Sequence, residues 1–246
     1  MAERPPRLEG KVAIVTGAGS SGEGVGNGKA AAILFAREGA KVLLVDFVEA
    51  RAQETAEIIK EEGGEASVFQ GDMTKLEDCQ NMVGAAMDRY GRVDILDNNV
   101  GISQRGTVVE VSEEDWDRTF AVNVKGTVHC CNAVMPHMKD RSYGKIINIA
   151  SMAGHAPRRS PGAYSASKAA VLRHTKGLAD SLAAHNINVN AICPGAVWTR
   201  FQEGGARITQ QSDPSLADKE LEQIFLDRYD PLIPLGRPQT PEDIGN

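Results

Sequence analysis

The sequence predicts an α/β fold in which a parallel β-sheet lies between two layers of helices. Short apolar runs alternate along the chain with segments of helical length, an order typical of β-α-β units. Because each run is continuously apolar, both faces of each strand are expected to be covered, as in a doubly wound parallel sheet. The chain has 246 residues, of which 41% are hydrophobic, enough for one large domain.

Six strands are predicted, each from its own apolar run. In chain order they cover residues 12–16, 41–46, 66–70, 94–97, 145–150 and 187–193. Right-handed crossovers join such strands into one sheet with three layers, α/β/α. We therefore expect a single dinucleotide-binding and catalytic domain over residues 1–246.

The first strand runs into a glycine-rich loop. Glycines occupy positions 17, 19, 22, 24, 26 and 28, and an alanine-rich helix then extends through Phe35. Glycine lets the backbone turn sharply and approach a phosphate, and the free N–H groups at a helix start attract an anion. This order of strand, loop and helix favours a dinucleotide site over a flexible linker.

The second strand ends on Asp46. A carboxylate at this place accepts hydrogen bonds from both hydroxyls of an adenosine ribose and repels a 2′-phosphate, which predicts NAD rather than NADP. The alternative is that Asp46 only caps the helix that follows.

A phenol and an amine, Tyr164 and Lys168, lie four residues apart. On a helix this spacing puts both on one face, so the ammonium is expected to lower the phenol pKa from about 10. Ser160 suits the N-cap and Pro161 the first position of this helix. Ser151 follows the fifth strand, and a strand end beside a helix start favours a catalytic site over an ordinary surface pair.

The segment 200–234 is polar and contains Gly204, Gly205 and Pro214, with a helix expected only over residues 215–229. Because it follows the end of the sixth strand, we expect it to be a substrate lid. A solvated excursion without a catalytic part is the alternative.

Composition excludes several classes of function. The net charge of −6 and the lack of a basic cluster argue against nucleic acid and favour a small-molecule partner. Residues 1–7 do not resemble a secretory signal, and no run approaches the length of a membrane span, so a cytoplasmic protein with no membrane partner is expected. The four cysteines and five histidines lack metal-ligand spacing, which predicts no metal.

Several motifs occur together in an order that resembles the short-chain dehydrogenase/reductase family, over residues 11–244. They are the Tyr164 to Lys168 segment, Ser151, Asn98-Asn99-Val100-Gly101, Asn123 and Pro194-Gly195. The resemblance implies a Rossmann-type fold and an NAD-dependent alcohol dehydrogenase or ketone reductase. Such an enzyme transfers a hydride between NAD(H) and a secondary alcohol or ketone. A homo-oligomer, tetramer or dimer, is also implied.

The resemblance further implies a role for each matching residue. Tyr164 is the general acid/base, Lys168 lowers its pKa and holds the nicotinamide ribose, and Ser151 hydrogen-bonds the substrate oxygen. Asn123 anchors a proton-relay water. Besides Tyr164 and Lys168, the implied cofactor contacts are Gly17, Gly26, Asn27, Gly28, Asp46, Asp72, Met73, Asn99, Val100, Gly101, Pro194, Gly195, Val197 and Thr199.

The sequence departs from the family pattern in three places. Its glycine loop is longer, so the matching glycines are 17, 26 and 28, with 17, 22 and 24 as the other register. Asp97 and Val100 stand where the family commonly has an apolar residue and an alanine, and a buried carboxylate needs a hydrogen-bond partner. The chain stops at Asn246, before the usual seventh strand, so either the sixth strand is an open edge or the sequence is part of a longer protein.

Two other functions are compatible with these motifs. An NADPH-dependent 3-oxoacyl thioester reductase shares the fold and the catalytic groups, although Asp46 speaks against it. A dinucleotide-binding regulator without turnover fits less well with a complete catalytic set. The sequence does not specify the substrate. The expected walls of its pocket are Ser103, Met152, His155, Ala156, Tyr164 and the lid. Arg158 and Arg159 either attract an anionic substrate or form a solvated pair.

Overall fold

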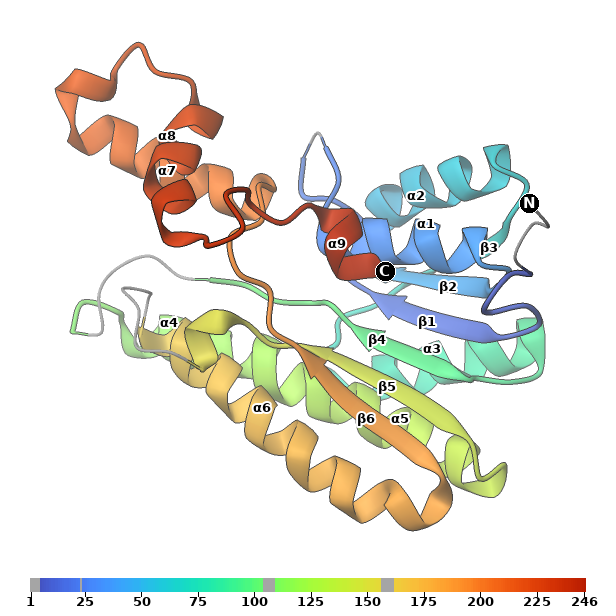
Figure 1. Cartoon of the computed structure of the whole chain (residues 1–246). Coiled ribbons are helices and arrows are strands. Elements are labelled where there is room, and N and C mark those ends of the chain that lie inside the picture. The colour runs from blue at the N-terminus through green and yellow to red at the C-terminus, as the bar shows by residue number, and fades with distance from the viewer. Residues whose placement is uncertain (1–4, 23, 104–108, 156–161) are drawn as a thin grey trace.

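A six-stranded parallel sheet with helices on both faces forms the centre of the protein (Figure 1). The structure, a computed structural model, describes residues 5–22, 24–103, 109–155 and 162–246. The strands are β1 (Val12–Thr16), β2 (Lys41–Asp46), β3 (Glu65–Gln70), β4 (Ile95–Asn98), β5 (Gly144–Ile149) and β6 (Ile187–Ile192). Their spatial order, β3-β2-β1-β4-β5-β6, confirms the predicted doubly wound fold.

The helices form two layers that cover the two faces of the sheet (Figure 1). One layer contains α1 (Asn27–Arg37), α2 (Glu49–Glu61) and the short α9 (Pro241–Gly245). The other contains α3 (Leu76–Tyr90), α4 (Glu113–Phe120), α5 (Gly126–Asp140) and α6 (Gly162–Leu182). A single π-helical turn, Ala121–Lys125, joins α4 to α5.

β1, at the centre of the sheet, is apolar up to Thr16 because it packs against both layers. Along β1, Ile14 joins the core cluster of the α3, α5 and α6 layer, while Ala13 and Val15 join the cluster of the α1 and α2 layer. All five residues of β1 are buried. This two-sided packing keeps the strands rigid and so holds the loops at their carboxyl ends in place.

The segment after β6 contains more helix than the sequence predicts. The expected helix over 215–229 is wrong in extent, because α7 covers Arg200–Ser212 and α8 covers only Leu221–Tyr229. Gly204 and Gly205 suggested irregular backbone, yet both lie in α7, where a Cβ would meet no atom within 4 Å. The two helices pack on each other and project beyond the sheet (Figure 1).

Candidate active site

The candidate site lies at the carboxyl ends of the strands, where the sheet changes the direction of its connections. β1 and β4 are neighbours, but β2 and β3 lie beyond β1, and β5 and β6 lie beyond β4. The loops after β1 and β4 therefore leave toward opposite sides, which opens a crevice where open α/β sheets bind their ligands.

Tyr164 lies in the first turn of α6, next to the end of β5. Burial raises the pKa of its phenol above the ordinary value, and a hydrogen bond with Ser151 opposes that rise. The predicted lowering of this pKa is therefore wrong for the groups that the structure describes. The Ser151 Oγ also accepts a hydrogen bond from the backbone N–H of Ala153, at 3.1 Å, which fixes the hydroxyl beside the phenol.

Lys168 lies one turn further along α6, on the same face as Tyr164, as predicted from their spacing. Its Nζ donates a hydrogen bond to the carbonyl oxygen of Ile149, at 2.7 Å, and lies 5.8 Å from the centroid of the Tyr164 ring. The side chain is buried, with 4% of the residue exposed, and burial lowers its pKa to about 8. The amine is thus tied to the end of β5, one helical turn from the phenol.

Asn123 is fully buried in the π-helical turn between α4 and α5. Its Oδ1 accepts from the backbone N–H of Ile102 at 2.8 Å, and its Nδ2 donates to the Ile102 carbonyl at 2.9 Å and to Ser167 Oγ at 2.9 Å. The side chain therefore joins the loop after β4 to α6. π-Helical turns of this kind are frequent at functional sites because the extra residue re-aims the side chains.

The glycine loop packs tightly where β1 meets α1. Gly17 has a positive φ of 66°, and a Cβ on Gly28 would overlap the carbonyl oxygen of Gly17. Gly26 is the N-cap of α1, so the structure has the register of glycines 17, 26 and 28 at the helix start. Next to Gly26, the buried Oδ1 of Asn27 has no hydrogen-bond partner among the described residues.

Asp46 holds the glycine loop against the end of β2. Its Oδ2 accepts from the backbone N–H of Gly19 at 3.1 Å, and its Oδ1 accepts from that of Val48 at 3.0 Å. Val48 is the N-cap of α2 and makes no side-chain capping bond. Asp46 is thus bonded to both the loop and the start of α2, with lone pairs left on its half-buried carboxylate.

The side chains of Asp72 and Met73, the predicted adenine neighbours, lie in different environments. The Oδ1 of Asp72 accepts from the backbone N–H and the hydroxyl of Thr74, at 3.0 and 2.7 Å. The Met73 side chain is buried in the core, where its Sδ lies 3.4 Å from the Sγ of Cys130. Only the backbone of Met73 is left for a cofactor contact.

The loop after β4 contacts the end of β1 with its first residues and Lys168 with its later ones. The backbone N–H of Asn99 donates to Thr16 Oγ1 at 3.2 Å, and a Cβ on Gly17 would lie 3.2 Å from the backbone nitrogen of Val100. At the other end of the loop, a Cβ on Gly101 would lie 3.2 Å from Lys168 Nζ. The three predicted residues Asn99 to Gly101 thus connect the two halves of the site.

The segment from Pro194 to Thr199 lies beyond β6. Gly195 donates its backbone N–H to Gln239 Oε1 at 2.7 Å, and the carbonyl oxygen of Pro194 accepts from Met152 at 3.0 Å. The Val197 side chain is buried against Ile149 and Ile244, so only its backbone is left for a cofactor contact. Thr199 is the N-cap of α7.

Asp97, near the end of β4, is the least satisfied carboxyl of the site. Only 2% of the residue is exposed, its Oδ2 accepts from Asn99 Nδ2 at 2.5 Å, and its Oδ1 has no partner among the described residues. Burial raises the pKa of Asp97 to about 7, and the bond from Asn99 opposes that rise only in part. A partly satisfied carboxyl in the core costs stability, and such groups are concentrated at functional sites.

Phe201 is a site neighbour that the sequence reasoning missed. Its ring centroid lies 5.8 Å from that of Tyr164, and 47% of the residue is exposed. Phe201 lies at the start of α7, a helix that was not predicted because Gly204 and Gly205 disfavour a helix in this segment. Of the predicted site neighbours, Ala156, Arg158, Arg159, Ser160 and Pro161 lie outside the described residues.

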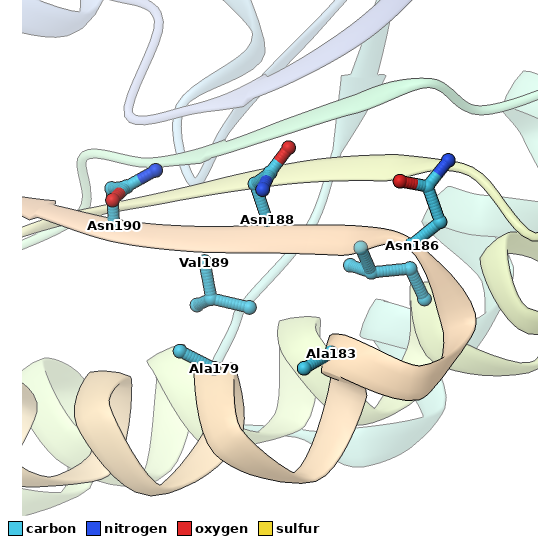
Figure 2. A pocket seen from close by; sticks show the side chains of 7 residues that line it. Ala179, Ala183, Asn186, Asn188, Val189 and Asn190 are labelled. Atoms are coloured by element: carbon cyan, nitrogen blue, oxygen red, sulfur yellow. The ribbon is translucent and has the colours of Figure 1, made fainter.

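A hollow of about 330 Å³ lies elsewhere, between the last turns of α6 and the first half of β6. Figure 2 shows Val189 and the alanines turned into it from strand and helix, while the asparagines of β6 point to the opposite side of the strand. It lies at the far end of α6 from Tyr164 and is not part of the candidate site. Its lining residues are Ala179, Ala183, Asn186, Ile187, Asn188, Val189 and Asn190.

Two other kinds of site were sought in the described ranges. No group of three or more histidine, cysteine, aspartate or glutamate side chains there is arranged to hold a metal ion. Within the same ranges, no helix has the length and apolar character needed to cross a bilayer.

The chain is similar to known proteins over nearly its whole length. The sequence profile of the family described as short chain dehydrogenase matches residues 11–207. An uncharacterized oxidoreductase of Thermotoga maritima is 43% identical over 96% of this chain and 88% of its own length. A 3-oxoacyl-[acyl-carrier-protein] reductase FabG of the same species is 35% identical over 97% of this chain and 88% of its own length.

A solved structure shows the same likeness. NAD+-bound xylitol dehydrogenase superposes on this chain with a TM-score of 0.86 and is 30% identical to it. The match covers 97% of this chain and 90% of the other.

The Asp97→Asn variant is expected to be more stable than the wild type at neutral pH and above. Asp97 has a folded pKa of about 7 against an ordinary 3.8, so the native state keeps a proton that the unfolded chain releases between these values. Wild-type stability therefore falls as pH rises from about 4 to about 7 and then levels off, whereas asparagine does not titrate. The advantage of the variant should grow over that window to a value on the order of 4 kcal/mol.

Urea unfolding of both proteins at several pH values measures this difference. A stability difference that stays constant between pH 4 and pH 8 would contradict a raised Asp97 pKa.

Proposed function

The chain belongs to the short-chain dehydrogenase family and is an oxidoreductase, and we propose that it interconverts a secondary alcohol and a ketone with NAD(H). One observation carries this proposal: Tyr164, Ser151 and Lys168 converge at the crevice beside the ends of β4 and β5. A phenol, a hydroxyl and an amine in this arrangement provide a proton donor, an anchor for the substrate oxygen and a fixed cation.

In the direction of reduction, the residues of the chain have separate tasks. The Tyr164 phenol is protonated at neutral pH and donates that proton to the ketone oxygen. Ser151, fixed by Ala153, orients the same oxygen. When bound, NADH would supply the hydride for reduction and NAD+ would accept it in oxidation. In oxidation the phenolate form of Tyr164 would take up the alcohol proton.

The glycine loop and Asp46 support a dinucleotide in the crevice. Gly17 has a positive φ and Gly28 leaves no room for a Cβ, so bare backbone lies at the start of α1, as close approach of a pyrophosphate requires. The first backbone N–H groups of α1, those of Asn27 and Gly28, are donors for the pyrophosphate at the same place. In the proposed complex Gly26, Asn27 and Gly28 hold the pyrophosphate, and Asp46 holds the adenosine ribose, which favours NAD over NADP.

The remaining cofactor contacts complete the groove. Lys168 and Gly101 lie where the loop after β4 meets α6, and we assign Lys168 to the nicotinamide ribose, with Gly101 lining the groove there. Asn99 lines the groove next to Gly17 and Gly28. We assign the nicotinamide carboxamide to Thr199 and the backbone of Val197, and the adenine to Asp72 and the backbone of Met73.

The helical pair α7 and α8 is proposed to cover the substrate. Phe201, at the start of α7, places a half-exposed aromatic ring next to Tyr164 and offers an apolar wall for the carbon skeleton of the substrate. Because these helices project beyond the sheet, they are free to enclose a substrate without disturbing the core.

A second candidate function is an NADPH-dependent 3-oxoacyl thioester reductase. The 35% identical FabG of Thermotoga maritima supports it. The Asp46 carboxylate at the expected ribose position argues against it, because the carboxylate would repel a 2′-phosphate.

Replacing Tyr164 with phenylalanine is expected to reduce turnover by about 10³-fold or more, because the proton donor is lost. NADH binding should change little, since the ring is retained. The assay follows NADH absorbance with a panel of ketones, sugars and hydroxysteroids, and NADH fluorescence reports binding. Tyr143→Phe, at the opposite end of β5, is the matched control and should retain full turnover; a Tyr164→Phe variant as active as this control would disprove the assignment.

Replacing Asp46 with serine is expected to narrow the preference for NADH over NADPH by about tenfold or more, because the carboxylate that repels the 2′-phosphate is gone. The ratio of kcat/KM for the two cofactors measures this preference in wild type and variant. A wild type that uses NADPH as well as NADH would favour the thioester reductase instead.

A further inference from the structure

The glycine loop contacts the first helix of the segment that follows β6. A Cβ on Gly22 would lie 2.7 Å from Arg200 Nε and 3.1 Å from Arg200 Cδ, so the arginine side chain packs directly on the bare backbone of Gly22. Gly22 lies between Gly17 and Gly26, in the stretch that is longer than in the family pattern. Neither the proposed pyrophosphate site nor the catalytic residues account for this contact.

Arg200 and its neighbour Phe201 join α7 to two different sides of the crevice. Arg200 contacts the loop after β1, and the Phe201 ring lies 5.8 Å from the Tyr164 ring on α6. The loop and α7 both lie at the carboxyl end of the sheet (Figure 1). The first turn of α7 therefore bridges the crevice in which we propose that the dinucleotide binds.

α7 has little packing of its own against the sheet. Ala206 is the single buried residue of this helix, whose thirteen residues all lie in the described part of the chain. Gly204 and Gly205 weaken the helix further, because glycine is a poor helix former. α8 packs on α7 but projects with it beyond the sheet (Figure 1). The position of α7 thus depends on the contacts of Arg200 and Phe201, and helices with so few buried contacts open at low free energy.

The base of the glycine loop lies where the dinucleotide is proposed to bind. Gly19 donates its backbone N–H to Asp46 Oδ2 at 3.1 Å, and Gly26 is the N-cap of α1. A Cβ on Gly26 would lie 3.9 Å from the carbonyl oxygen of Gly19, so the two ends of the stretch 19–26 lie side by side. Between them, Ser21 and Gly24 are exposed. A ribose at Asp46 and a pyrophosphate at the start of α1 would hold both ends of this stretch.

We propose that Arg200 is a positioning residue: through its contact with Gly22 it couples dinucleotide binding at the glycine loop to the position of α7, and so places Phe201 beside Tyr164. The inference rests on the proposed function, because it requires NAD(H) in this crevice. A dinucleotide that fixes the loop also fixes the surface on which Arg200 packs. The apolar wall for the substrate is then in place more of the time when the dinucleotide is bound.

The alternative is that Arg200 only stabilises its own helix. Arg200 and Arg207 both pair with Glu203, one on each oxygen of the carboxylate. The two arginine side chains are similarly exposed, at 46% and 53%. Of the two, Arg200 is the one that packs on Gly22. Arg207 is therefore a matched control, because its replacement removes an equivalent ion pair and the same charge but leaves the contact with the loop.

The test is hydrogen exchange of the backbone amides of α7, followed by mass spectrometry with and without saturating NAD+. The variants are Arg200→Gln, Gly22→Ala and the control Arg207→Gln. Alanine at position 22 displaces the arginine from the loop side, and the φ of Gly22 is not positive, so the substitution adds no backbone strain. NAD+ should slow exchange about tenfold in the wild type and the control. Most of this slowing should be lost in Arg200→Gln and Gly22→Ala.

The affinity for NAD+ gives a second readout, because coupling between two sites is reciprocal. Calorimetry should show that the Kd of NAD+ rises in Arg200→Gln and Gly22→Ala by up to about tenfold, the same factor by which NAD+ slows exchange in the wild type. The control should bind NAD+ like the wild type. These constants also set the NAD+ concentration that saturates each variant.

Several outcomes would overturn the inference and leave the proposed function intact. They are an effect of NAD+ on α7 that persists in Arg200→Gln, one that is absent from the wild type, and one that is lost equally in the control. Faster exchange of α7 in Arg200→Gln by the same factor with and without NAD+ would assign Arg200 to helix stability alone and would overturn it too. Exchange of β1 in the same data shows that each variant is folded. A chain that binds neither NAD+ nor NADH would refute the proposed function and this inference with it.

Discussion

Parallel strands all end at the same edge of a sheet, and this constraint gathers residues that lie far apart in the sequence into one crevice. Gly17 follows β1, Asp46 ends β2, Asn99 follows β4 and Ser151 follows β5. The hydrogen bond from Lys168 to the carbonyl oxygen of Ile149 then ties α6 to the same edge. Tyr164 thus receives its place from the sheet as much as from its own helix.

The electrostatics of the crevice follow from how deeply its groups are buried. Burial favours the neutral form of each group, which raises the pKa of Tyr164 and Asp97 and lowers that of Lys168. Several groups that change charge are therefore kept near neutrality inside one site. This arrangement is typical of sites that move protons, and it contrasts with the ion-paired Asp94 at the other end of β4.

The fold and the arrangement of the proposed catalytic residues were largely predictable because they depend on local signals. Continuous apolar runs define the strands, and spacing along a helix puts Tyr164 and Lys168 on one face. The positions of other side chains depend on tertiary packing and could not be predicted. The Met73 side chain turns into the core, Phe201 reaches Tyr164 from a helix that two glycines concealed, and the amine of Lys168 bonds to a strand end rather than lowering the phenol pKa. No sequence pattern encodes the depth at which a side chain is buried.

The central claim is that one dinucleotide spans the crevice from Asp46 to Tyr164. A crystal structure of the protein with bound NADH tests it most directly. The expected result is an adenosine ribose hydrogen-bonded to Asp46, a pyrophosphate at the start of α1 and a nicotinamide ring beside the Tyr164 hydroxyl. A nicotinamide ring remote from Tyr164, or a nucleotide bound outside the crevice, would contradict it.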